Sequence, residues 1–254
     1  MMIDIFLCKR EKYTFGGIFL ITDDASLIEA VKSEDYVDID NIYGLIPMDV
    51  RLHMQRVNSG CRLLAELMLE KEVEEEDELA MVVTYSDRIF RYHDIGYGFL
   101  PIKTYCNSKA DNNVLDMKKF FELDNSDEGM FASHVELGND AYEIPLFLYR
   151  DSNVDKLSID VSMYHHEKWD GTGFPEGLKG KDIPLVARIC AVMDMYDMFA
   201  EFYPCTKENK NKYVIDALSQ VSGEFLQPEI VDIVKENADV FFEHDMECGN
   251  VNMF

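Results

Sequence analysis

The residues best suited to chemistry are two adjacent histidines, His165 and His166, which precede a turn sequence. The chain has only six histidines in 254 residues. Neighbouring imidazoles can bind two metal ions, or one ion from two sides. The glycines Gly171 and Gly173 and then Pro175 follow the pair, and glycine and proline both interrupt helical backbone. The run therefore predicts a pair of metal ligands at the end of a helix, beside a loop.

Further candidate ligands are spread along the chain, and they are His53, His93, Asp94, His134 and Asp194. Borderline divalent metals favour imidazole and carboxylate ligands. A carboxylate next to a histidine can bridge two ions while the imidazole binds one of them. Two ions about 3.5–4 Å apart form a clamp for the hydrolysis of phosphate esters. Each histidine taken alone is more often an ordinary core or surface residue, so the prediction of a metal site depends on the whole set.

The elements that must position these residues are predicted to be mainly helical from Pro47 onward. Hydrophobic periodicity and helix-boundary residues predict helices at about 47–67, 79–92, 155–166, 184–202, 211–222 and 228–243. The stretch 126–149 carries His134. Residues 1–45 are predicted to form a small α/β segment, with strands around Gly16-Gly17, a helix at 26–33 and a strand at 36–40. We therefore expect a helical domain at 46–254 whose polar ligands project inward.

The composition limits the classes of protein to which this chain can belong. The net charge is −25, which argues against a DNA-binding protein because such proteins need a basic face. The six cysteines form no Cys-x-x-Cys pair, so reduced thiols and a cytoplasmic location are expected. No apolar stretch approaches the length of a membrane span, and the start of the chain does not resemble a signal peptide. We expect no membrane partner.

The order of these motifs resembles that of the HD-GYP subgroup of the HD-domain metal-dependent phosphohydrolases, the family of the cyclic di-GMP phosphodiesterases. The resemblance covers residues 48 to 240 approximately. The matching segments are 53–57, 93–98, 134–138, 165–175, 178–189, 194–197 and 223–231. The segment from 165 to 197 is the most specific part of the match.

This resemblance implies an HD-domain helical bundle that hydrolyses cyclic di-GMP or a related cyclic dinucleotide with two or three divalent metal ions, most often iron or manganese. It also makes signalling proteins, including GGDEF-type proteins, candidate partners. One ion would be held by His53, His93, Asp94 and Asp194. The second would be held by Asp94, His134, His165 and His166. Asp49 stands where trinuclear members have a glutamate, so the resemblance leaves open whether a third ion binds there. The catalytic positions are those of Asp94, Tyr97 and Asp197. The substrate-binding positions are those of Phe174, Arg188, Asp197, Tyr203 and Lys207.

The chain also departs from the family pattern. Tyr97 stands where the family has a lysine that interacts with the scissile phosphate, and Phe174 replaces the tyrosine of the name-giving motif. Tyr203 and Thr206 stand at positions that are basic in active members. Loss of one charge-assisted contact to a transition state typically costs about 10²–10³ in rate. The polar stretch at 107–129 is longer than usual, which is typical of a lid or a partner-binding loop.

Two hypotheses follow from these matches and departures. The favoured one is an active phosphodiesterase whose substrate is cyclic di-GMP, cyclic GMP-AMP or a linear dinucleotide. The alternative is a catalytically weak module that keeps its metals and acts as a nucleotide sensor or a protein-interaction partner. A degenerate protein with an empty site is a third interpretation, which the complete set of ligands disfavours.

Overall fold

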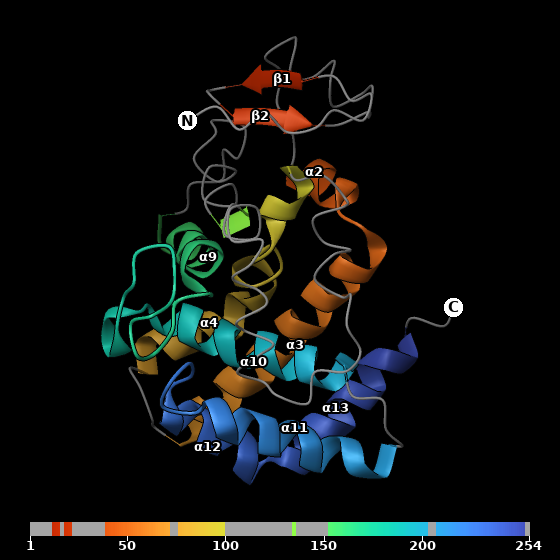
Figure 1. Ribbon diagram of the computed structural model, residues 1–254, viewed down its shortest axis with the longest axis vertical. Coiled ribbons are helices and arrows are strands. Elements are labelled where there is room, and N and C mark those ends of the chain that lie inside the picture. The colour runs from red at the N-terminus through yellow and green to blue at the C-terminus, as the bar shows by residue number, and fades with distance from the viewer. Residues whose placement is uncertain are drawn as a thin grey trace.

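The computed structural model describes residues 12–15, 18–21, 39–71, 76–99, 134–135, 152–202 and 207–251, and most of these are helical (Figure 1). The prediction of a mainly helical bundle is confirmed. Its α-helices are α2 (Ile39–Leu45), α3 (Met48–Glu70), α4 (Glu76–Ile89), α9 (Ser152–Tyr164), α10 (Leu185–Phe202), α11 (Lys207–Val221), α12 (Pro228–Glu236) and α13 (Ala238–Val251). Two 3₁₀ helices are η1 (Ile95–Phe99) and η3 (Gly180–Asp182). No helix in this described part of the chain is both long and apolar enough to cross a membrane.

A β-hairpin lies at one end of the helical body, beyond α2 (Figure 1). Strands β1 (Lys12–Phe15) and β2 (Ile18–Ile21) pair in antiparallel fashion, which confirms the two strands predicted around the Gly-Gly pair. The helix predicted at 26–33 lies outside the described residues.

The strand predicted at 36–40 is wrong for its last two residues, which begin α2. The reason is tertiary packing, because Ile42 of α2 and Ile46, directly after the helix, are both buried. The α2 helix also packs against η1, where a Cβ added at Gly98 would lie 2.7 Å from the side chain of Ile42. The boundary between residues 45 and 46 stays a prediction.

Helix α3 is a central element of the bundle, and it packs against α4, α10, α12 and α13. Its buried residues recur every three or four positions, and they include Val50, Met54, Val57, Cys61, Leu64 and Met68. This spacing places one apolar face in the core. The neighbouring face of α3 is therefore free to carry His53 and Arg56.

Helix α10 begins directly after Pro184 and lies against α3. Much of its surface is in the core, including Val186, Ile189, Cys190, Val192, Met193 and Phe199. The two helices approach closely, because a Cβ added at Gly60 of α3 would lie 2.4 Å from the Cε of Met193. This close approach brings the polar residues of α10 within reach of the polar face of α3.

The chain that was predicted to form one helix over 228–243 forms two, α12 and α13. The break is at Asn237, whose backbone has left the helical conformation with φ −116° and ψ 26°. Its side-chain amide donates a hydrogen bond of 2.8 Å to the carbonyl of Ile233. Asparagine competes for backbone partners in this way, which explains why it ends helices.

Candidate metal centre

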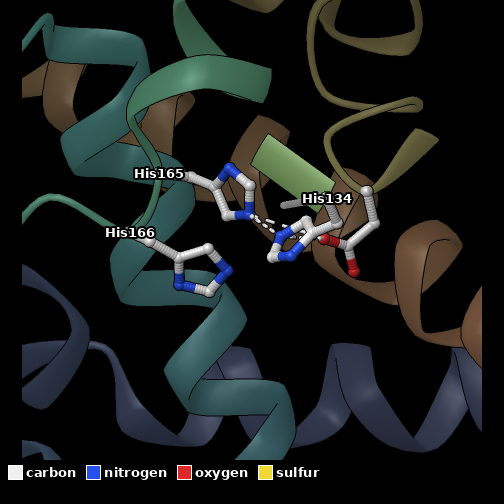
Figure 2. A group of neighbouring side chains, drawn as sticks. His134, His165 and His166 are labelled. Atoms are coloured by element: carbon white, nitrogen blue, oxygen red, sulfur yellow. Dashed lines mark hydrogen bonds and ion pairs between the residues drawn. The ribbon is translucent and has the colours of Figure 1, made fainter. Parts of the chain in front are cut away.

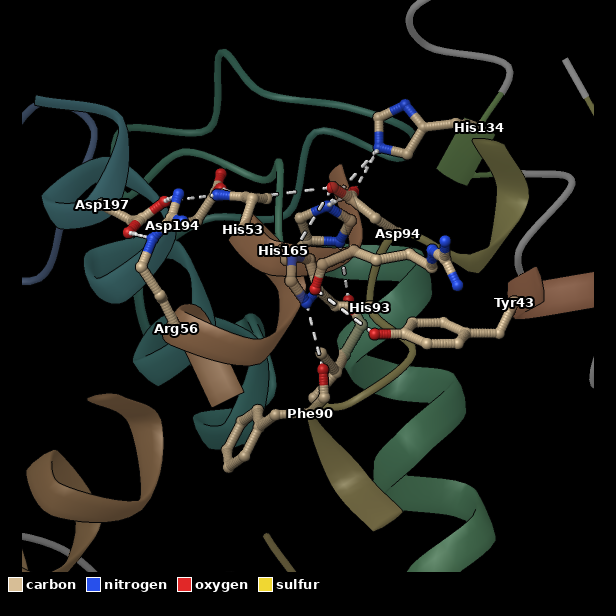
Figure 3. Close-up of polar contacts among 12 residues, drawn as sticks. Tyr43, His53, Arg56, Phe90, His93, Asp94, His134, His165, Asp194 and Asp197 are labelled. Carbon is tan, nitrogen blue, oxygen red and sulfur yellow. Dashed lines mark hydrogen bonds and ion pairs between the residues drawn. The ribbon is translucent and has the colours of Figure 1, made fainter. Parts of the chain in front are cut away.

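The carboxylate of Asp94 lies among four imidazoles, two on each of its oxygens (Figure 3). Its Oδ2 is 3.5 Å from His93 Nε2 and 3.7 Å from His53 Nε2. Its Oδ1 is 3.4 Å from the Nε2 atoms of both His134 and His165. These distances exceed an ordinary hydrogen bond. Two ligands that bind one tetrahedral ion at about 2.1 Å would be about 3.4 Å apart, so the spacing fits a carboxylate that bridges two ions.

The described residues contain two groups whose ligand atoms all lie within 4.8 Å of one another. One group is Asp94, His134, His165 and His166, and the other is His53, His93 and Asp94. This division agrees with the ligand sets that the family resemblance implied. Asp194 lies beside the second group, with its Oδ1 3.0 Å from His53 Nε2. Asp49 is exposed in the first turn of α3 and belongs to neither group.

Hydrogen bonds to backbone carbonyls orient two of the imidazoles. His93 Nδ1 is 3.0 Å from the carbonyl of Phe90, and His165 Nδ1 is 2.9 Å from that of Val161. Because a carbonyl can only accept, each Nδ1 carries a proton, and in the neutral form of the imidazole each Nε2 presents a lone pair toward Asp94. His93 Nε2 is buried without a hydrogen-bond partner, which costs about 1–3 kcal/mol. A divalent ion would satisfy this nitrogen, so the donor set fits a metal.

The electrostatics of the cluster also suit metal binding. Burial lowers the pKa of His93, and burial together with the neighbouring His165 and His134 lowers the pKa of His166 well below its usual value. Neutral imidazoles are the form that binds metal. Although burial opposes ionisation, His93 and His165 hold the pKa of Asp94 well below its usual range. The centre therefore combines an ionised carboxylate with neutral imidazoles at His93 and His166.

Although burial opposes protonation, contacts with Asp194 and Asp197 raise the pKa of His53. Contacts with Asp94 likewise raise the pKa of His165 against the effect of burial. A bound ion would take the place of the proton on these two imidazoles.

His165 and His166 follow the last turn of α9, and their rings lie near His134 (Figure 2). The Nε2 atoms of His134 and His165 are 3.5 Å apart. The ring centroids of His134 and His166 are 4.9 Å apart. The prediction of a histidine pair at a helix end beside a loop is confirmed, while the role of each residue as a ligand stays a prediction.

The loop that follows is held by Glu167, a residue that sequence reasoning missed. Its buried carboxylate accepts hydrogen bonds from the backbone N–H groups of Glu176, Gly177 and Leu178, at 2.7, 3.0 and 3.0 Å. A carboxylate that accepts several backbone N–H groups acts as a strong local clamp. The available signal was an acidic residue directly before a run of glycines and proline.

Two of the departures from the family pattern are aromatic rings that lie on candidate ligands. Tyr97, in η1 and 8 % exposed, stacks on His134 with centroids 4.4 Å apart and planes 8° apart. Phe174 stacks on His166 with centroids 5.2 Å apart and planes 21° apart. Both rings therefore pack against the group that contains His134 and His166.

Asp197, which was predicted to be catalytic and substrate-binding, is 4 % exposed and contacts His53 and Arg56. Although burial opposes ionisation, hydrogen bonds from these two residues lower the pKa of Asp197 to about 2. Sequence reasoning also missed Arg56. Its signal was the position one turn after His53 on the same helix face.

Of the remaining predicted substrate contacts, the structure describes the side chain of Arg188 but not those of Tyr203 and Lys207. The guanidinium of Arg188 is buried and donates to the carbonyl of Ile183 at 2.8 Å and to the side chain of Gln227. Tyr203 lies outside the described residues. Lys207 is the first residue of α11, and its side chain lies outside them as well.

Sequence comparisons with known proteins show which family this chain belongs to. Residues 152–230 match the family model described as HD domain. A cyclic di-GMP phosphodiesterase of Pseudomonas aeruginosa is 39% identical over 230 residues, which cover 86% of this chain and 50% of that protein. The chain belongs to the HD-GYP group of HD-domain proteins.

Two other HD-GYP relatives show how far the similarity extends. The 3'3'-cGAMP-specific phosphodiesterase 2 of Vibrio cholerae is 25% identical over 228 residues, which cover 90% of this chain and 38% of that protein. A cyclic di-GMP phosphodiesterase of Thermotoga maritima is 32% identical over 95 residues, which cover 36% of this chain and 26% of that protein. The chain spans half or less of the length of these relatives.

Replacement of the Asp94 carboxylate tests the metal centre. We expect Asp94→Ala to lose both ions, because each group of candidate ligands includes Asp94. Elemental analysis of purified protein measures this loss, and circular dichroism checks the fold. His244→Gln is the matched control, since His244 lies on α13 against Ser59 and belongs to neither group. Unchanged metal content in Asp94→Ala would contradict the assignment.

A glycine in the loop offers a second test. A Cβ added at Gly173 would lie 2.2 Å from the backbone nitrogen of Lys168, so Gly173→Ala must displace the loop that carries Phe174. We expect a loss of about 1–3 kcal/mol in the free energy of unfolding, measured by urea denaturation. In the control Gly44→Ala, the added Cβ meets no atom within 4 Å, and stability should be kept. Equal stabilities for the two variants would contradict the close packing of this loop.

Proposed function

We propose that this chain is a metal-dependent phosphodiesterase that hydrolyses a cyclic dinucleotide, cyclic di-GMP or a related one such as cyclic GMP-AMP. The observation that carries the proposal is the position of the Asp94 carboxylate, with two imidazole nitrogens near each oxygen. A bridging carboxylate with imidazoles on both sides is suited to two-ion hydrolysis of phosphate esters. The similarity to phosphodiesterases of cyclic di-GMP and of 3'3'-cGAMP supports the same substrate class.

Within this proposal, each candidate ligand has a definite task. The first ion would be held by His53, His93, Asp94 and Asp194. The second would be held by Asp94, His134, His165 and His166. Bound divalent ions, for which we propose iron or manganese, would supply Lewis-acid polarisation of the phosphoryl group and activation of water. Asp94 would serve both ions, and the backbone carbonyls of Phe90 and Val161 hold the imidazoles of His93 and His165 with Nε2 toward Asp94, where an ion would bind.

The negative charge of the chain makes bound metal ions the main expected source of attraction for the substrate. The chain has a net charge of −25, so its general field repels an anionic dinucleotide. Tyr97 carries no charge at neutral pH where the family places a lysine. Phosphate attraction would therefore come chiefly from the ions, which predicts slower turnover than in relatives that have the lysine.

The second candidate function is a catalytically weak module that keeps its metals and acts as a nucleotide sensor or a protein-interaction partner. Tyr97 favours it, because its ring packs flat on His134 and presents no cation to a phosphate. Iron, manganese and zinc in the purified protein should be measured first. Turnover with Mn²⁺ or reduced iron should then be assayed on cyclic di-GMP, 3'3'-cGAMP and linear di-GMP, with Asp94→Ala as the inactive control. Bound metal without turnover of any of these substrates would reject the enzyme and favour the sensor.

The position of Tyr97 provides a test of the missing charge. If the absent cation limits the rate, Tyr97→Lys should raise kcat/KM on the best substrate by up to about 10²–10³. Tyr97→Phe is the matched control, because it keeps a ring against His134 and adds no charge, and it should leave kcat/KM near the wild-type value. Metal content is measured in both variants. A Tyr97→Lys variant with full metal and no gain in rate would contradict this explanation.

A further inference from the structure

Arg56 and Asp197 form a two-pronged ion pair beside the metal centre (Figure 3). Arg56 Nε is 2.6 Å from Asp197 Oδ1, and the second nitrogen of the fork, Nη2, is 2.9 Å from Oδ2. The same Oδ2 is 2.7 Å from His53 Nδ1. Both carboxylate oxygens therefore have partners within the protein, and the fork restricts the plane in which the carboxylate lies.

The two helices contribute these residues in pairs with the same spacing. On α3, His53 and Arg56 are three residues apart, and on α10 Asp194 and Asp197 are three residues apart. Residues at this spacing are neighbours on one helix face. The imidazole of His53 lies between the two carboxylates, with Nε2 3.0 Å from Asp194 Oδ1 and Nδ1 2.7 Å from Asp197 Oδ2.

His53 is oriented by a different kind of hydrogen-bond partner from the one that orients His93 and His165. Their Nδ1 atoms contact the carbonyls of Phe90 and Val161, three and four residues earlier in the chain. His53 instead depends on a carboxylate that lies 144 residues away in sequence, on another helix. A carboxylate side chain can rotate, so its direction must be set by a further partner. Arg56, on the same face of α3 as His53, provides that partner.

We propose that Arg56 and Asp197 are positioning residues for the ion at His53, and that they act through His53 without touching the substrate. The inference rests on the proposed metal centre and deepens it. Asp197 is 4 % exposed and both of its oxygens already accept hydrogen bonds from Arg56 or His53, so it is poorly placed to contact an anionic phosphate. Its contact to Nδ1 leaves Nε2 of His53 directed toward Asp94 and Asp194. Partners of this kind orient metal-binding imidazoles and raise their basicity.

Titration with Mn²⁺, followed by the electron paramagnetic resonance signal of the free ion, tests this role. We expect Arg56→Met and Asp197→Asn each to weaken one of two Mn²⁺ sites by about 10–100-fold. The site formed by His134, His165 and His166 should keep its affinity. Arg56→Lys, which keeps the charge but not the fork, should lie between wild type and Arg56→Met. The matched control is Arg62→Met on the same helix, where the side chain is 56% exposed and pairs with Glu66, and both sites should be unchanged.

The outcomes separate this inference from the proposal on which it rests. Wild-type protein that binds no Mn²⁺ would overturn the metal centre itself. Wild-type protein that binds two ions, with unchanged affinities in Arg56→Met, would overturn the positioning role alone, and a fall in kcat/KM in that variant would then mark a substrate contact. Melting of the metal-free proteins is measured in parallel. Equal loss of both ions, with a lower melting temperature and no recovery in Arg56→Lys, would assign Arg56 a general structural role and overturn the inference.

Discussion

The buried carboxylate of Asp94 is the constraint around which the rest of the structure is arranged. It is 6 % exposed and faces Nε2 atoms that come from α3, from the turn after α4, from residue 134 and from the end of α9. A buried charge is tolerated only when partners compensate it. Those partners come from segments far apart in the sequence, so the bundle must bring several elements to one point with their imidazoles directed inward.

The packing of α3 against α10 meets much of this requirement. Gly60 allows a close approach to Met193 in the apolar part of the contact. The polar part of the same contact places His53 between Asp194 and Asp197. The Nδ1 atoms of three of these imidazoles each contact an acceptor on the side away from Asp94. The acceptor is a backbone carbonyl for His93 and His165, and it is the carboxylate of Asp197 for His53. Orientation of the imidazoles thus depends on backbone geometry at two positions and on tertiary packing at the third.

Much of the fold and of the candidate site could be predicted, and each miss has a physical cause. The helices that deliver His53, His93, His165 and Asp194 follow from apolar periodicity, with Pro47 directly before α3 and Pro184 directly before α10. The residues at 39–40 were misassigned because β-propensity is a weak guide when burial against η1 favours a helix. Arg56 and Glu167 were missed because their partners are an aspartate on another helix and three backbone N–H groups in a loop. The local signals, a basic residue one turn after His53 and an acidic residue before the glycine and proline run, do not identify such distant partners.

The sequence alone determined which helices form and which imidazoles and carboxylates lie at their ends and on their faces. The order of these residues also carried the resemblance to a family. Residue types and local spacing are sufficient to predict the helices and the candidate ligands, because helix formation and ligand chemistry are local properties. Only the tertiary structure decided which side chains surround these ligands, with Asp197 on His53 and the rings of Tyr97 and Phe174 on His134 and His166. These relations join residues from separate elements, and only the packing of those elements sets their distances.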